Sequence, residues 1–270
     1  MEPRSRPRII LGLVAFFGLI TLFTVGLFML PWRSEVASDE GGGIDAVITY
    51  LLVATGALVV LGHYVLIRFL WNGNGEKGYT RPTPKVEWMW GIIPVVIMMI
   101  LSEAGVLVVG APTWKKLYVD RAENPVQIEV VGKQFQWYVR YPGKDGVYGD
   151  YDFEEIDGAD NPLGLLDDSD AAVDDIVTSK LRLPLGRPVQ IRMRTHDVIH
   201  SFFVPDFRVK QDLIPGFPTE IRFTPTKLGE YELACSELCG LAHYRMKAPV
   251  LVMEPEAFDK WLAAQRGYFE

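Results

Sequence analysis

Two cysteines, a histidine and a methionine lie close together near the C-terminus of this 270-residue chain. They fall in the stretch Cys235-Ser-Glu-Leu-Cys239-Gly-Leu-Ala-His243-Tyr-Arg-Met246. Two thiolates, an imidazole and a thioether form a soft ligand set that suits copper. A single blue copper centre uses one cysteine, two histidines and a weak methionine. The second cysteine would therefore be left over, and it could bind a further metal ion.

A second imidazole is available upstream, in Asp197-Val-Ile-His200-Ser. Two thiolates can bridge two copper ions, and each ion then needs its own imidazole, which His200 and His243 would supply. Two alternatives stand beside this interpretation. Cys235 and Cys239 can form a disulfide outside the cytoplasm, and zinc can bind Cys and His but makes no use of Met246. The full set of donors favours copper.

Three apolar segments precede these residues, at 9–30, 44–70 and 86–111. As a helix, the first would span about 33 Å, enough to cross a bilayer core. Its basic start and the small residues of Val36-Ala37-Ser38 also fit a cleaved signal peptide, so both interpretations stay open. Glu103 lies inside the third segment, where an acid is either functional or hydrogen-bonded to a partner helix. His63, in the second segment, is interpreted as structural.

Basic residues between the segments indicate the topology. Arg4, Arg6 and Arg8 precede the first segment, and the loop at 72–85 is also basic. The N-terminus and this loop are therefore predicted to be cytoplasmic, and everything after residue 111 to lie outside. Tryptophans are predicted near the membrane faces: Trp32, Trp71, Trp88, Trp90 and Trp114.

Beyond residue 111 the pattern changes to short alternating runs separated by Pro and Gly, which predict strands of a β-sandwich or small barrel. These runs are 126–131, 181–183, 189–194, 220–223, 231–234 and 248–253. A short helix is predicted at 256–265. Residues 150–175 interrupt the rhythm with many acids and no Lys or Arg. We interpret them as a solvated surface insertion, in preference to a calcium site, that can steer a basic partner.

Composition narrows the class of protein. The hydrophobic content of 49% beside 23% charged residues fits a chain that is part membrane and part water-exposed. The net charge of −7 argues against nucleic acid as a partner and accommodates a basic one. The sequence has no Cys-x-x-Cys-His, so it carries no c-type haem attachment of its own.

The pattern C-x-E-x-C-G-x-x-H-x-x-M, with D-V-x-H-S upstream, resembles the dinuclear copper A motif of cytochrome c oxidase subunit II. Residues 86–94, 132–141 and 209–216 are similar to the start of that family's last membrane helix, its aromatic strand and the loop after its first histidine. The resemblance covers residues 44–265.

The resemblance implies a membrane α-helical anchor of two or three transmembrane helices, followed by an all-β cupredoxin-like Greek-key barrel. The expected domains are a signal peptide or first helix with its loop (1–43), a transmembrane hairpin (44–111) and an external copper A domain (112–270). The implied copper ligands are the side chains of His200, Cys235, Cys239, His243 and Met246, with the backbone carbonyl of Glu237. The Glu237 side chain would also reach a magnesium ion shared with subunit I, and Glu87 would lie at the mouth of a proton channel.

The implied function is electron transfer within a haem-copper terminal oxidase. Such a chain receives electrons from cytochrome c or another c-type haem donor and passes them to subunit I, in a complex that includes subunit III. The complex reduces oxygen and translocates protons in the bacterial inner membrane, with the copper domain on the periplasmic face; the oxygen site is not on this chain. The alternatives are the copper A subunit of a nitric oxide reductase and a stand-alone membrane-anchored copper carrier.

One departure from the family concerns where electrons arrive. Phe135 occupies the position at which the family usually has tryptophan. We expect Phe135 to share a strand with Trp137, which would place both side chains on one face. Both residues are candidates for the point at which electrons arrive.

Overall fold

The computed structural model describes residues 6–29, 33–72, 82–158, 160–167 and 170–270. The chain divides into two compact units. A helical unit comprises Met1–Ser34 and Asp45–Ala111, and a β unit comprises Glu35–Ile44 and Pro112–Glu270. Each unit has its own construction.

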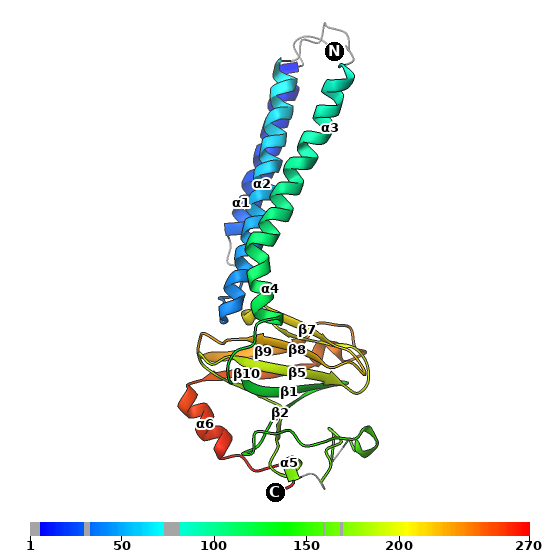
Figure 1. The fold of residues 1–270 in the computed structure, drawn as a ribbon. Helices are drawn as coiled ribbons and strands as arrows, with labels where there is room; N and C mark the ends of the chain where they lie inside the picture. Colours follow the sequence, from blue (N-terminus) through cyan, green and yellow to red (C-terminus); the bar gives the residue numbers. More distant parts are fainter. Residues whose placement is uncertain (1–5, 30–32, 73–81, 159, 168–169) are drawn as a thin grey trace. The chain divides into compact units, whose positions relative to one another are not determined.

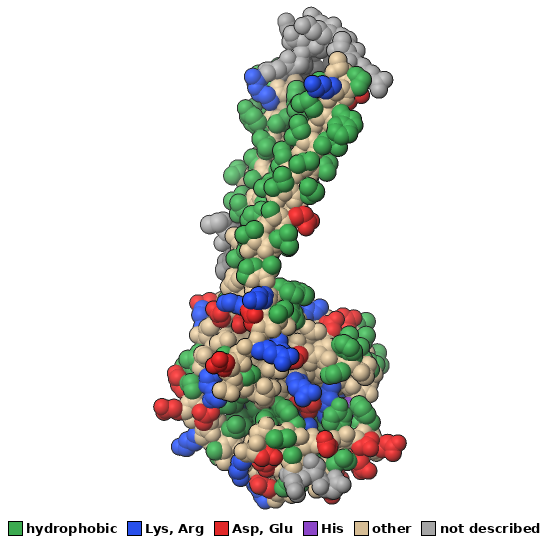
Figure 2. Space-filling view, in the orientation of Figure 1, with side chains coloured by type: hydrophobic (Ala, Val, Ile, Leu, Met, Phe, Trp, Pro, Cys, Tyr) green, Lys and Arg blue, Asp and Glu red, His purple; other side chains and the backbone are tan. Residues whose placement is uncertain are grey.

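The helical unit is built on α1 (Arg6–Met29), α2 (Asp39–Asn72) and α3 (Pro84–Met99) (Figure 1). Three stretches are long and apolar enough to cross a membrane, namely Pro7–Leu27, Asp39–Phe69 and Pro84–Tyr118. Most of their apolar side chains are exposed, as the green surface of the helices in Figure 2 shows. Apolar helices of this length bury such side chains in lipid or against other helices. The predicted helical anchor is therefore confirmed.

The third span changes its winding along its length. After α3 come two π-helical segments, η1 (Ile100–Ala104) and η2 (Val106–Gly110), and then α4 (Ala111–Tyr118). Tyr50 of α2 packs its ring against Gly105 and donates its hydroxyl hydrogen to the carbonyl of Leu101. Tyr50 thus ties the π-wound segment to α2.

The β unit consists of two five-stranded sheets (Figure 1). The first has the order β3 (Ile176–Thr178), β2 (Gln136–Tyr141), β1 (Val126–Lys133), β5 (Val189–Thr195) and β8 (Thr219–Phe223). The second has the order β4 (Leu181–Pro184), β10 (Lys247–Met253), β9 (Gly229–Cys235), β6 (His200–Val204) and β7 (Val209–Leu213). Pairing is parallel for β1 with β5 and for β10 with β4, and antiparallel elsewhere.

Alternating side chains of both sheets form the core, as the sequence pattern predicts. Ile128 and Val130 of β1 are fully buried, as are Phe202 and Val204 of β6. The C-terminal helix α6 (Pro255–Ala263), close to the predicted bounds, adds the buried ring of Phe258. The prediction of an all-β domain after the helices is confirmed. One stretch assigned by resemblance to a loop forms strand β7 over most of its length.

Residues 35–44, which include the start of α2, pack into the β unit. Ala37 donates its backbone N–H to the carbonyl of Asp206 at 2.8 Å, and Ser38 Oγ donates to the carbonyl of Phe207 at 2.7 Å. The Glu40 carboxylate accepts from the Thr224 N–H at 2.9 Å. Residues 35–44 are therefore held against the segments that follow β6 and β8.

The acidic stretch at 150–175 is interpreted from the sequence as a solvated surface insertion. This interpretation is wrong in one respect, because some side chains of the stretch are buried. It contains η3 (Phe153–Glu155) and α5 (Asp170–Val173). Leu163 and Leu165 form a small buried cluster with Val131 of β1. Its last acid, Asp175, is fully buried. In the described part of the chain, its acids do not gather into a group able to hold a cation.

Asp175 is buried because it neutralises a buried arginine. Arg140 of β2, 1% exposed, donates to Asp175 through Nε at 3.0 Å and also through its terminal guanidinium group. Arg140 donates further to Glu129 at 3.2 Å, and Glu129 accepts from Arg194 at 3.1 Å. Charges out of water need partners of this kind. The acidic stretch is therefore anchored to the first sheet by an ion-pair network.

Candidate metal centre

Two of the candidate metal ligands come from neighbouring strands of the second sheet. His200 begins β6 and Cys235 ends β9, and the register pairs Phe202 with Cys235. Ser236 donates its N–H to the carbonyl of Ser201 at 3.0 Å, which fixes the end of β9 against β6. His200 and Cys235 therefore sit on rigid elements.

The remaining donors come from the connection between β9 and β10. A 3-10 helix, η5 (His243–Arg245), lies just before Met246, and the N–H of Cys235 donates to the Met246 carbonyl at 3.0 Å. This bond closes the loop at its base, so Cys239 and His243 are held above the end of the sheet. Gly240 has φ +137°, a conformation that L side chains rarely adopt.

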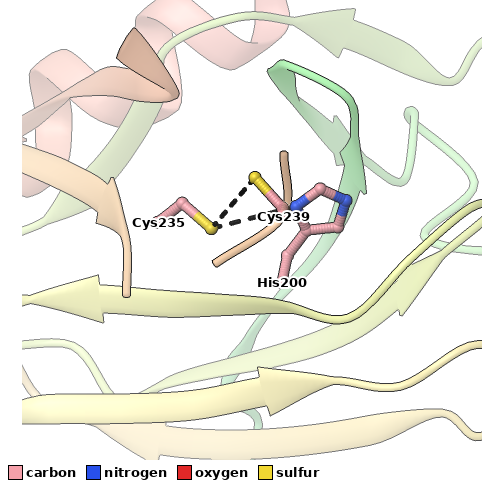
Figure 3. Close-up of side chains that lie close together, drawn as sticks. All are labelled: His200, Cys235 and Cys239. Atoms are coloured by element: carbon pink, nitrogen blue, oxygen red, sulfur yellow. Dashed lines mark hydrogen bonds between the residues drawn. The ribbon is translucent and has the colours of Figure 1, made fainter. Parts of the chain in front are cut away.

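Five side-chain donor atoms converge on this point. The two sulfurs are 3.9 Å apart, Cys235 Sγ is 3.8 Å from His200 Nδ1, and Cys239 Sγ is 3.6 Å from His243 Nδ1 (Figure 3 shows His200 and the two cysteines). Met246 Sδ lies 3.7 Å from Cys239 Sγ, and the Glu237 carbonyl lies 3.2 Å from Cys235 Sγ. Each sulfur thus has one imidazole and one weaker donor beside it.

The separations suit metal binding and not a disulfide. A disulfide needs sulfurs about 2.05 Å apart, and both cysteines are free. With bonds of about 2.3 Å to sulfur and about 2.0 Å to nitrogen, tetrahedral ligands lie about 3.6–3.8 Å apart. A zinc site of two cysteines and two histidines would leave the nearby thioether of Met246 without a role. The donor set therefore fits soft copper chemistry best.

An ionised carboxylate sets the orientation of His200. The Nε2–H of His200 donates to Asp197 Oδ1 at 2.8 Å, and the other carboxylate oxygen accepts from the Gln134 N–H at 2.7 Å. Burial alone would raise the pKa of Asp197, but the hydrogen bonds from Gln134 and His200 hold this pKa below its ordinary value. Because Nε2 donates to Asp197, Nδ1 is the ring nitrogen that faces Cys235 and the one whose lone pair would bind a metal.

The two thiols differ in acidity before a metal binds. Burial would raise the pKa of Cys235, but hydrogen bonds with His200 and the local backbone lower it to about 6. Burial and the negative charge of Cys235 raise the pKa of Cys239 to about 11. Near neutral pH the pair therefore keeps one proton, which would be lost if both sulfurs bound a metal ion.

The β1–β2 turn supports the ligand loop from the side. The Gln134 side chain donates to the carbonyl of Cys239 at 2.5 Å. The ring of Phe135 packs so closely on Gly240 that a Cβ there would lie 3.0 Å from its Cζ. The supporting roles of Gln134 and Asp197 were not predicted, because a hydrogen bond between distant segments leaves no spacing signal in the sequence.

The predicted pair Phe135 and Trp137 needs a correction. Phe135 lies in the turn between β1 and β2, because the strands end at Lys133 and resume at Gln136, so it does not share a strand with Trp137. Trp137 is 1% exposed, donates Nε1–H to the Met246 carbonyl at 3.3 Å, and has its ring centroid 6.1 Å from that of His200. Both aromatic residues nevertheless contact the ligand region.

The other singled-out residues lie elsewhere. Glu87 is in the first turn of α3, and Glu103 is in η1, within the third span. His63 is hydrogen-bonded within α2 to the Val59 carbonyl at 2.7 Å. Trp32, Arg4 and most of the predicted cytoplasmic loop at 72–85 lie outside the described residues.

Comparison with known proteins places this arrangement in a family. Residues 126–254 match the family model described as cytochrome C oxidase subunit II, periplasmic domain. The alternative cytochrome c oxidase subunit 2 of Bradyrhizobium diazoefficiens is 33% identical over 93% of this chain and 91% of its own length. The probable cytochrome c oxidase subunit 2 of Rickettsia felis is 30% identical over 87% of this chain and 73% of its own length.

A solved structure is also similar. The periplasmic domain of subunit II of the Bradyrhizobium japonicum cytochrome oxidase is 27% identical, covers 52% of this chain and 93% of that one, and has a TM-score of 0.39. The match to the Bradyrhizobium diazoefficiens relative runs nearly the full length of both chains. This chain belongs to the cytochrome c oxidase subunit II family.

Proposed function

We propose that this chain is the electron-transfer subunit of a haem-copper terminal oxidase and holds a dinuclear copper A centre. The observation that carries the proposal is the convergence of two free thiols, two imidazoles and a thioether, with neighbouring donors 3.6–3.9 Å apart. The proposed ligands are His200, Cys235, Cys239, His243, Met246 and the backbone carbonyl of Glu237. When bound, the copper pair would accept and release one electron shared between its two ions.

The role of the protein is to hold these ligands in fixed positions while the copper pair would be oxidised and reduced. Asp197 holds His200, Gln134 holds the Cys239 carbonyl, and the Cys235–Met246 backbone bond closes the loop. Ligands fixed in this way move little on reduction and oxidation, which keeps electron transfer fast at small driving force. The buried ring of Trp137 excludes water beside His200.

We propose that electrons arrive near Phe135. Its ring rests on the loop between Cys239 and His243, and it is only partly buried, so a donor's haem edge can approach it. Phenylalanine is hard to oxidise, so its role would be a packed apolar contact. The exposed acids Glu154 and Glu155 of η3 would attract a basic donor such as a cytochrome c. Phe153 of the same turn packs edge-on against His196, with ring centroids 5.2 Å apart, one residue from Asp197.

The remaining roles are proposed from the resemblance to the family. The exposed Glu237 side chain would reach a magnesium ion shared with subunit I, and Glu87 would admit protons at the start of the third span. Subunits I and III would be the membrane partners, with the copper domain on the periplasmic side of a bacterial inner membrane. Leu241 and Leu238, 98% and 79% exposed on the ligand loop, suit burial against such a partner.

The test is electron transfer in the purified complex. On the proposal, reduced cytochrome c reduces the copper centre of the assembled oxidase, and the haems of the partner and consumption of oxygen follow. Purification without a haem-containing partner would support a stand-alone carrier instead. Consumption of nitric oxide in place of oxygen would make the chain a subunit of a nitric oxide reductase.

Glu87→Gln sharpens the same test. Because this change removes a proton carrier at the start of a membrane span, turnover should fall while reduction of copper by the donor keeps its rate. An equal loss of both rates would point to misfolding and would remove the proton role.

A further inference from the structure

An acidic side chain lies deep within the third apolar span, Pro84–Tyr118. Glu103 follows Trp88 by 15 residues and precedes Trp114 by 11 residues (103 − 88 and 114 − 103). At the α-helical rise of about 1.5 Å per residue, an upper value for the π-wound turns, these aromatic residues are at most about 22 Å and about 16 Å away along the helix. A glutamate side chain is far too short to reach the membrane surface over either distance. Its carboxyl group therefore stays at the depth of the hydrocarbon.

The π-wound segment turns Glu103 away from α2. Leu101 and Gly105 both contact Tyr50, and Gly110 packs against Val47, so this side of the segment faces α2. Glu103 is midway between Leu101 and Gly105 in sequence and therefore about half a turn from each. It is exposed, as are the residues on either side of it. The carboxyl group points to the side that α2 does not cover.

Within the described part of the chain, Glu103 makes no hydrogen bond or ion pair. Ser102, its neighbour, is already used, because its hydroxyl donates to the Met98 carbonyl at 2.8 Å. Acidic groups are sparse along the helical unit on the face seen in Figure 2. Polar groups in hydrocarbon are normally paired inside a protein, and π-wound turns are frequent at functional positions. A lipid acyl chain has no hydrogen-bond donor to offer.

We infer that the exposed side of this segment, the Glu103 face, is a docking surface for a transmembrane helix of a partner subunit that donates a hydrogen bond to the carboxyl. The inference rests on the proposed function only in requiring a membrane partner. The face continues with Leu107, four residues on and 64% exposed, which would pack against the same helix. The polar contact fixes the register of the two helices, and the apolar side chains supply packing.

Two substitutions in the full-length chain, expressed with its complex, separate the hydrogen bond from simple apolar packing. Glu103→Leu makes the span more apolar, so a defect cannot come from failure to enter the membrane. We expect its retention in the detergent-solubilised complex to fall to about a fifth of normal. Glu103→Gln still accepts a hydrogen bond and should stay within about twofold. Leu22→Val, at an exposed apolar position of α1 outside the π-wound segment, is the matched control and should leave retention unchanged.

A photo-crosslinking residue at Leu107 provides the direct readout, because it leaves Glu103 in place. The expected product joins this chain to another membrane subunit, and its yield should drop when Glu103→Leu is added. Normal retention of Glu103→Leu, or crosslinks to lipid alone, would overturn the inference. The copper spectrum of the same samples tests the proposed function separately, since an intact spectrum with normal retention of Glu103→Leu removes only the docking surface.

Discussion

The β unit and the helical unit of this chain satisfy their polar groups in different ways. In the β unit, the buried Arg140 donates hydrogen bonds to Asp175 and Glu129. His200 donates to Asp197 of the same unit. In the helical unit, Glu103 lies in an apolar span and forms no hydrogen bond or ion pair with the described residues. On the two proposals above, the metal site is complete within this chain, whereas the membrane part needs a helix of another subunit to pair with Glu103.

The largest expected effect is on the metal site itself. Cys235→Ser or Cys239→Ser removes one of the two sulfurs, which lie 3.9 Å apart and are proposed to bridge the coppers. The shared-valence spectrum of the copper centre should disappear in either variant, as recorded by electron paramagnetic resonance of the purified complex. Retention of that spectrum in either variant would show that the sulfur is not a bridge.

The next effect is on the stability of the β unit. Arg140→Ala leaves the buried Asp175 carboxylate without its cation, which should cost about 3–5 kcal/mol of unfolding free energy. Arg187→Ala is the matched control, because Arg187 pairs with Asp259 on the surface at 2.7 Å and should cost about 0–1 kcal/mol. Denaturant unfolding of the two variants measures the difference. Equal costs would mean that the acidic stretch is not anchored by this network.

The sequence predicted the ligands well because they lie in one short loop, where Cys235, Cys239, His243 and Met246 are spaced by three or four residues. It also predicted the apolar spans and most strands, since hydrophobic runs and alternation are local signals. It missed the burial of Asp175, because pairing with Arg140 joins positions 35 residues apart. It placed Phe135 in a strand because nothing in Lys133-Gln134-Phe135 marks a turn.

A smaller effect is expected from the thioether. Met246→Leu keeps the volume of a fully buried side chain but removes a weak ligand. Both coppers should stay bound while the reduction potential shifts, because a weak axial donor tunes a site more than it assembles one. Redox titration with metal analysis checks both points. Loss of copper as severe as in the cysteine variants would reverse this ranking of the ligands.

The smallest effects concern the arrival of electrons. Phe135→Ala should slow reduction of copper by cytochrome c at every salt concentration, because it removes an apolar contact beside the ligand loop. Glu154→Gln with Glu155→Gln should slow it mainly at low salt, where exposed charges act over longer distances. Glu256→Gln, an exposed acid in α6, is the control.

Stopped-flow reduction across ionic strength distinguishes these cases. A normal rate in Phe135→Ala, combined with a large loss in Trp137→Ala, would move the arrival point to the buried tryptophan. A salt-independent loss in the double glutamine variant would argue against long-range steering by η3.

The central claim is that the β unit of this chain holds a complete dinuclear copper site. Copper analysis of the purified full-length chain, together with its electron paramagnetic resonance spectrum, tests this most directly. The account predicts a purple protein with two coppers per chain and an unpaired electron shared equally between them. A blue protein with one copper per chain, or a colourless one that holds zinc in the same ligands, would contradict it.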